Sequence, residues 1–120
     1  MIISKTAKTK NKITGDIGEC KAAKFLVDKG YEIIETNYKN KIGEIDIIAQ
    51  DENRIVFVEV KARATAKFGY PREAVNIYKQ NKIKMVADIY LKSKHLTNSY
   101  IRFDVIEILA DKITHLIAAF

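Results

Sequence analysis

The sequence predicts one α/β domain in which a mixed β-sheet is flanked by helices, and three observations support this prediction. The chain has 120 residues, 48% of them hydrophobic and 30% charged, which suits a single folded domain. Two segments have the periodicity of helices, and five have the composition of strands. Their order is helix, three strands, helix, two strands, which indicates a mixed sheet with helices packed against it.

The first helix is expected over residues 16–29. Asp16 suits the N-cap position, and Glu19 three residues later would complete a capping box. Gly30 follows the last helical residue, where glycine commonly ends a helix. Residues 31–36 are then expected to form the first strand.

The N-terminal segment is expected to stand apart from this domain. Residues 1–14 carry four lysines and no acid, which predicts a flexible basic arm before a single domain over residues 15–120. No stretch has the apolar length of a membrane span or of a secretory signal. Cys20 is the one cysteine, so the chain has no internal disulfide. A cytoplasmic protein without a membrane partner is therefore expected.

The middle of the chain predicts a β-hairpin. Residues 43–50 and 54–62 are rich in β-branched side chains, and the polar residues 51–53 join them by a short turn. A turn centred between Glu52 and Asn53 would place Asp46 directly opposite Glu59.

The C-terminal half predicts one helix and two strands. Asn76 suits the N-cap of a helix that reaches about Ser93, and strands follow over residues 100–109 and 113–117. The apolar side chains of this helix recur at intervals of three and four, which predicts that one face is buried. They are Ile83, Val86, Ala87, Tyr90 and Leu91.

Acidic and basic groups are unevenly distributed along the chain. The net charge is +6; residues 15–60 sum to −4 and residues 61–94 to +7. An acidic segment followed by a basic one suits a protein that binds a metal ion beside a polyanion. A solvated helix face and a basic tail would produce the same distribution.

Asp46, Glu59 and Lys61 are the candidate catalytic residues. Strand alternation places Glu59 and Lys61 on one face, and the expected register brings Asp46 to the same place. Two carboxylates about 4 Å apart repel each other by roughly 4 kcal/mol at an effective dielectric constant of 20, and one lysine cannot neutralise both. A divalent cation can, and Mg²⁺ (or Mn²⁺) suits a site with few carboxylates. The alternative is a cross-strand salt-bridge cluster.

Further residues are candidates for metal and nucleic-acid binding. Glu19 is a candidate third metal ligand beside Asp46 and Glu59, although it would also serve as a cap of its own helix. Basic side chains after the acid pair are candidates for phosphate contacts, and Tyr70 and Tyr78 for base stacking, although scattered aromatic side chains more commonly serve packing. A lysine at the edge of a helix face more commonly extends to solvent. The basic candidates are Arg63, Lys67, Arg72, Lys79, Lys82 and Lys84.

These motifs together resemble those of the YraN family of small bacterial proteins. The likeness runs in order from about residue 15 to 109. Its motifs are Gly15-xxx-Glu19, Gly43-Glu44-Ile45-Asp46-Ile47-Ile48-Ala49, Phe57-Val58-Glu59-Val60-Lys61-x-Arg63, Phe68-Gly69 and Arg102-Phe103-Asp104-Val105. That family resembles the restriction-endonuclease-like, or PD-(D/E)xK, superfamily and its archaeal Holliday-junction resolvases. Ile45 stands where the superfamily signature has proline.

The resemblance implies a restriction-endonuclease-like fold and a metal-dependent nuclease. Asp46 matches the first acid of the signature, Glu59 and Lys61 match its second part, and Glu19 matches the helical acid of the resolvase-like branch. The implied activity is hydrolysis of phosphodiesters in structured or branched DNA, with a homodimer as the candidate assembly. The alternative is a nucleic-acid-binding accessory protein that keeps the fold but has little or no hydrolytic activity.

Overall fold

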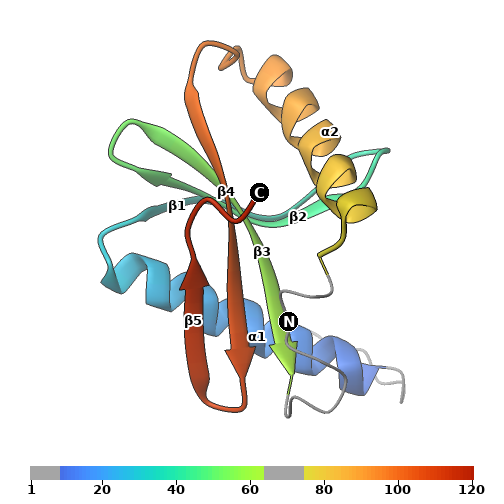
Figure 1. Ribbon diagram of the computed structural model, residues 1–120, viewed down its shortest axis with the longest axis vertical. Coiled ribbons are helices and arrows are strands. Elements are labelled where there is room, and N and C mark those ends of the chain that lie inside the picture. Colours follow the sequence, from blue (N-terminus) through green and yellow to red (C-terminus); the bar gives the residue numbers. More distant parts are fainter. Residues whose placement is uncertain (1–8, 64–74) are drawn as a thin grey trace.

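A five-stranded mixed sheet forms the centre of the protein, with one helix on each face (Figure 1). The computed structural model describes residues 9–63 and 75–120, and the side chains from Ile17 onward. The elements are α1 (Thr9–Asp28), β1 (Glu32–Lys39), β2 (Glu44–Asp51), β3 (Arg54–Arg63), α2 (Ile77–Ser93), β4 (Tyr100–Leu109) and β5 (Lys112–Leu116). This order confirms the predicted succession of helices and strands.

The strands lie in the order in which they occur along the chain. Neighbouring strands are antiparallel except β3 and β4, which are parallel because α2 carries the chain back between them. The predicted mixed sheet is thus confirmed. The hairpin of β2 and β3 has the register expected from its turn, with Asp51 opposite Arg54 and Ile47 opposite Val58.

The first helix begins earlier than the sequence indicates. It starts at Thr9, so Asp16 lies inside α1 and is not its N-cap, and residues 9–14 of the expected arm are helical. Extending a formed helix costs far less than starting one, so weak helix formers at Gly15 and Asp16 do not stop it. Residues 1–8 lie outside the described part of the chain.

The end of α1 agrees with the expectation from Gly30. This glycine has φ of +96°, a left-handed conformation that favours glycine. The Gly30 N–H donates to the Val27 carbonyl, and the Tyr31 N–H donates to the Leu26 carbonyl. These two bonds form a Schellman motif, which ends the helix and turns the chain into β1.

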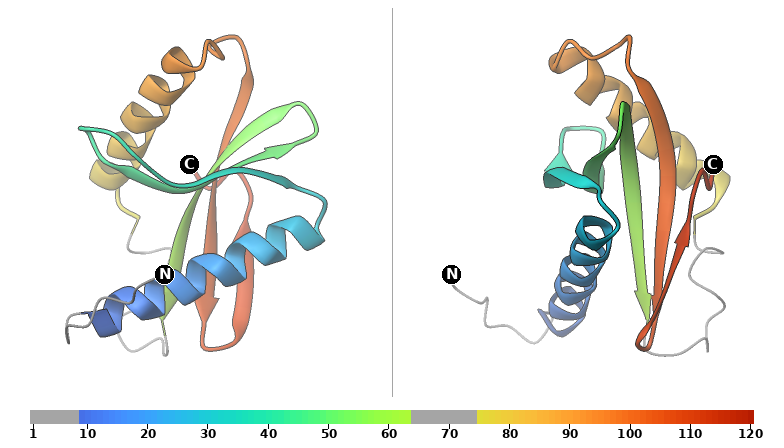
Figure 2. Two further views of the ribbon diagram at one scale, coloured as in Figure 1. Left: turned by 180° about the vertical axis from the view of Figure 1, so that it is seen from behind. Right: turned by 90° about the vertical axis from the view of Figure 1, so that its left-hand side faces the viewer.

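Each helix lies over its own face of the sheet, as the side view in Figure 2 shows. Each also buries one stripe of side chains against that face. Asn76 caps α2 by accepting a hydrogen bond from the Lys79 N–H at 2.9 Å, as predicted. The five apolar residues predicted for the buried face of α2 are all buried. They pack with Ile48 and Phe57, whereas Leu26 of α1 packs with Val56 and Ile106 on the opposite face.

None of the helices in the described part of the chain is long and apolar enough to cross a membrane.

Candidate metal and phosphate site

The β2–β3 ladder ends one pair before Asp46 and Glu59. Ile47 and Val58 are the last paired residues, although β2 continues beside β1 and β3 continues beside β4. The two strands then separate, and Figure 2 shows β2 turning to the side while β3 runs on along α1. The two acids therefore lie at the point where the sheet opens.

Asp46 replaces a missing ladder bond at this opening. Its Oδ2 accepts a hydrogen bond from the Val60 N–H at 2.8 Å, where a paired strand would have supplied a backbone carbonyl. A short polar side chain thereby satisfies a backbone donor that would otherwise lack a partner from β2. This bond fixes the Asp46 carboxyl beside β3.

Glu59 is buried between two lysines. Its side chain is 7% exposed, and its Oε2 lies 3.4 Å from Lys61 Nζ and 3.0 Å from Lys79 Nζ. Lys61 comes from the same face of β3, whereas Lys79 reaches Glu59 from the third residue of α2. The buried carboxylate is thus held by ion pairs from two elements.

The electrostatics of Asp46 are unfavourable for a second negative charge. Burial raises the pKa of Asp46, and the neighbouring Glu59 carboxylate raises it further, to about 8. The Val60 N–H opposes this shift, and the Glu19 carboxylate adds to it. Without a further cation, Asp46 therefore holds a proton at neutral pH and can share it with Glu59.

Lys79 stays charged despite partial burial. Burial lowers the pKa of its ammonium group, but the attraction of Glu59 and the hydrogen bond to it outweigh that effect and raise the pKa overall. The site therefore places two ammonium groups, those of Lys61 and Lys79, beside the acid pair.

The structure brings four of the candidate residues into one neighbourhood: Asp46, Glu59, Lys61 and Lys79. Glu19 acts on Asp46 through its charge, from α1 on the opposite face of the sheet. Within the described residues, however, no three acidic, histidine or cysteine side chains are arranged to hold one metal ion. Any metal site here rests on the Asp46–Glu59 pair, with Glu19 further out.

Two residues nevertheless fit a magnesium ion. Mg²⁺ commonly takes one or two carboxylates and keeps waters or phosphate oxygens at its other positions. The acid pair offers that donor set, and a cation would relieve the repulsion that keeps Asp46 protonated.

Among the described residues of the predicted basic rim, Lys82 and Lys84 do not share one surface. Lys82 Nζ lies 3.3 Å from the Tyr78 hydroxyl, whereas Lys84 Nζ lies near the rings of Phe103 and Phe120. The two lysines extend from different sides of α2, because residues two apart on a helix do not share a face. Arg63 is half-buried at the end of β3, and Lys67 and Arg72 lie outside the described residues.

Sequence reasoning missed a second charged cluster on the other face of the sheet. Asp104 is fully buried and pairs with Arg102 at 2.9 Å and with His115 Nε2 at 2.7 Å. Burial opposes ionisation of Asp104, but His115 and Arg102 outweigh it and lower its pKa to about 2. The available signal was the alternation of Arg102 and Asp104 in a largely apolar strand.

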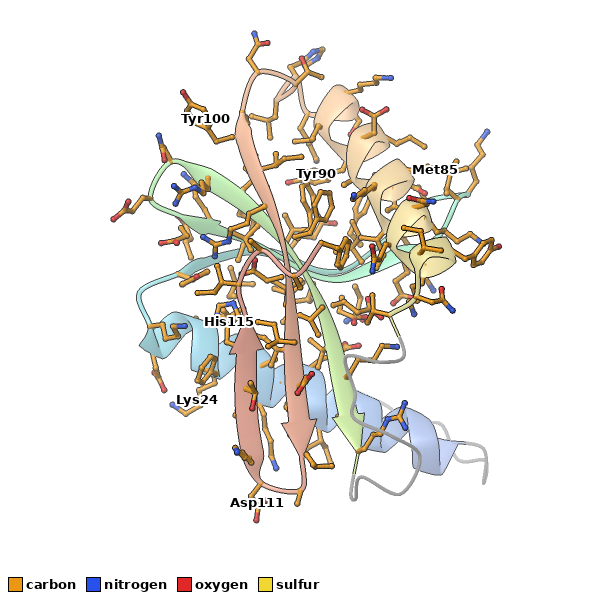
Figure 3. The ribbon with its side chains drawn as sticks, viewed as in Figure 1. Lys24, Met85, Tyr90, Tyr100, Asp111 and His115 are labelled. Carbon is orange, nitrogen blue, oxygen red and sulfur yellow. The ribbon has the colours of Figure 1, made fainter. Side chains whose placement is uncertain are left out.

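His115 joins this cluster to α1 (Figure 3). Its Nδ1 lies 2.8 Å from Lys29 Nζ, and an ammonium group can only donate. Nδ1 is therefore an acceptor, and the proton on Nε2 is donated to Asp104. Tyr31 and Asp51 complete the cluster through Arg102.

Fold and site together define an α/β protein with a mixed sheet, opened beside a buried carboxylate pair. The sequence profile of the "Uncharacterised protein family UPF0102" matches residues 18–108, and the chain belongs to that family. This membership confirms the predicted YraN-like family.

Similar proteins occur in several bacteria. A UPF0102 protein of Clostridioides difficile is 52% identical over 112 residues, covering 92% of this chain and 98% of the relative. One from Caldanaerobacter subterraneus is 45% identical over 120 residues, covering 94% and 98%. One from Acetivibrio thermocellus is 48% identical over 106 residues, covering 88% and 82%.

Proposed function

We propose that this protein is a Mg²⁺-dependent nuclease of the restriction-endonuclease-like class that hydrolyses phosphodiesters in structured or branched DNA. The observation that supports this most is the Asp46–Glu59 pair at the opening of the sheet, with Lys61 on the same strand. The two lysines of the cluster, Lys61 and Lys79, both pair with Glu59. Asp46 keeps a pKa raised to about 8 by burial and by the Glu59 carboxylate, and a bound cation would lower it.

The roles of the residues follow from their charges. Asp46 and Glu59 would hold the metal ion, which when bound polarises a phosphate and activates water. Lys61 places an ammonium group where it can orient the attacking water or stabilise the negative charge that develops on the phosphate. Lys79 places a second ammonium group beside Glu59 and within reach of a phosphate brought to the acid pair.

One observation favours the alternative function, a DNA-binding accessory protein with little hydrolytic activity. Glu59 already has two lysine partners, and the described residues do not assemble a three-ligand metal site. Such a protein would keep the basic surface and the fold, and it would bind DNA without cleaving it.

A cleavage assay separates these two functions. Wild-type protein should cut a four-way junction or a flap substrate in Mg²⁺ or Mn²⁺ and not in EDTA. Loss of a residue that hydrogen-bonds a metal ligand typically lowers activity or metal affinity by about 10- to 100-fold. Asp46→Asn replaces a proposed ligand itself, so it should lower the cleavage rate by about 100-fold or more. Asp28→Asn, which changes an exposed acid of α1, is the matched control.

DNA binding in EDTA completes the test. Asp46→Asn should bind as tightly as the wild type near pH 7, where Asp46 already holds a proton, and more tightly above about pH 8, where wild-type Asp46 adds a negative charge near the phosphates. Binding should weaken as the salt concentration rises. On duplex DNA, the logarithm of the affinity should fall against the logarithm of the salt concentration with a slope of about −0.9 per phosphate contact. Salt-dependent binding without cleavage in either metal would support the accessory function, and no binding at low salt would contradict both.

A further inference from the structure

A small pocket lies next to the acid pair, between the start of α2 and the start of β2. It has a volume of about 210 Å³ and is lined by Gly43, Glu44, Tyr78, Lys79, Lys82 and Ile83. Lys79 connects the pocket to the acid pair, because this residue lines the pocket and its Nζ lies 3.0 Å from Glu59 Oε2. A group in the pocket would therefore be one lysine side chain away from a phosphate at Glu59.

Gly43 belongs to a tightly packed wall of the pocket. A Cβ atom on Gly43 would lie 3.3 Å from Val86 Cγ2, so a larger residue here would require the Val86 side chain to shift. Asn40 secures the approach: its Oδ1 accepts the Ile42 N–H at 2.9 Å, and its Nδ2 reaches the Val86 carbonyl at 3.5 Å. The wall is fixed before any ligand arrives.

Tyr78 supplies an aromatic surface that the protein does not use for packing. Its side chain is 69% exposed although it belongs to the same helix as the buried core residues. Lys82 Nζ lies 3.3 Å from the Tyr78 hydroxyl but 5.4 Å from the ring centre, so the ammonium group sits at the hydroxyl edge and not over the ring. The ring remains available for stacking.

The chemistry of the lining suits a nucleobase attached to a phosphate backbone. Aromatic rings beside basic side chains are the means by which proteins bind unpaired nucleotides, since every base has a face that can stack. Lys79 and Lys82 provide the positive charges, and the Glu44 carboxylate can accept a hydrogen bond from an exocyclic amino group of a base. The volume is below the roughly 300–1,000 Å³ typical of drug-sized ligands and suits a single ring system.

We propose that this pocket takes one unpaired nucleobase, stacked on Tyr78, from the nucleotide next to the phosphate at the acid pair. The inference rests on the proposed function and sharpens it. The preferred substrate is DNA that presents a single-stranded nucleotide, at a flap, a junction or an end, and not an uninterrupted duplex. A base inside a duplex would first have to be unstacked, which costs free energy.

The test is DNA binding in EDTA, where no hydrolysis takes place. Three probes are compared: a short single strand, the same strand with abasic sites at its centre, and the matching duplex. Stacking on an aromatic side chain contributes enough that Tyr78→Ala should weaken binding to the intact single strand by about 5- to 150-fold. Binding to the abasic strand and to the duplex should change little, and Tyr78→Phe should keep the affinity for the single strand.

Tyr100 offers a matched control. It is also 69% exposed, but it lies at the start of β4, far from the start of α2 (Figure 3). Tyr100→Ala should bind all three probes as the wild type does. Equal losses on intact and abasic strands for Tyr78→Ala, an unchanged affinity, or the same loss for Tyr100→Ala would each overturn the proposal.

The same proteins assayed in Mg²⁺ separate this inference from the proposed function. Binding that depends on Tyr78 without cleavage would support the base pocket and contradict the nuclease. Cleavage by the wild type, with binding that does not depend on Tyr78, would support the nuclease and contradict the pocket. No binding of any probe by the wild type would overturn the pocket as well.

Discussion

Asp46 and Asp104 lie on strands of the same sheet but in opposite electrostatic surroundings. Asp104 accepts four hydrogen bonds, from Arg102 Nε and Nη2, His115 Nε2 and the Ala118 N–H. Asp46 accepts the Val60 N–H and faces the Glu59 carboxylate. The pKa of Asp104 is accordingly lowered to about 2, and that of Asp46 is raised to about 8.

The two pKa values distinguish a structural carboxylate from one that we propose to be functional. The partners of Asp104 come from β4, from β5 and from the residues after β5, so the charge holds the C-terminal part of the chain to the sheet. The two lysines beside the acid pair contact Glu59, and the pKa of Asp46 stays raised by burial and by the Glu59 carboxylate. Acids with strongly shifted pKa values cluster at functional sites.

The largest effect is expected from breaking the cluster of Asp104 with Arg102 and His115. Asp104→Asn should lower the free energy of unfolding by about 3 kcal/mol, because it removes the charge that pairs with the largely buried Arg102 at 2.9 Å and leaves Asp51, at 3.3 Å, as the remaining carboxylate partner. For a domain of this size the melting temperature should fall by more than about 10 °C. Asp28→Asn, which breaks an exposed pair with Lys24, should cost no more than about 1 kcal/mol. Similar melting temperatures for the two variants would contradict the structural role of Asp104.

Replacing Asp46 should instead raise the stability of the metal-free protein at high pH. The pKa of Asp46 is higher in the folded than in the unfolded state, so its contribution to stability is present below pH ~4 and is lost as pH rises toward about 8. Asp46→Asn keeps an acceptor for the Val60 N–H and removes the ionisation. Its melting temperature should equal that of the wild type near pH 4 and exceed it by several degrees above pH 8.

Thermal melts in EDTA across this pH range measure the difference. Asp104 provides the internal contrast, because its lowered pKa makes a contribution that is present above pH ~4 and is lost as pH falls toward 2. If the melting temperatures of wild type and Asp46→Asn stay parallel from pH 4 to 9, Asp46 does not carry the proton assigned to it.

Local patterns predicted most of the fold and the centre of the site. Asn76 and the buried face of α2 follow from residues within one helix, and the register that brings Asp46 near Glu59 follows from the length of one turn. The start of α1 was missed because Asp16 is a good cap, but a helix that is already formed extends past it.

Contacts between distant segments could not be predicted in this way. Asp104 meets His115 across the β4–β5 turn and, through Arg102, joins Tyr31 after α1. Lys79 was predicted as a phosphate contact, but its pairing with Glu59 depends on how α2 crosses β3. The separation of Lys82 from Lys84 was available from helical periodicity alone, because residues two apart point in different directions.

Calorimetric titration of the wild type with Mg²⁺ near pH 7, in buffers of different ionisation enthalpy, tests the central claim most directly. The claim is that Asp46 and Glu59 form a cation site that is protonated when no metal is bound. The account predicts saturable Mg²⁺ binding with release of about one proton per ion. The affinity for Mg²⁺ should rise with pH up to about 8. Asp28→Asn should behave in the same way, and Asp46→Asn should lose the binding. Binding that releases no proton and survives in Asp46→Asn, or no binding by the wild type, would contradict it.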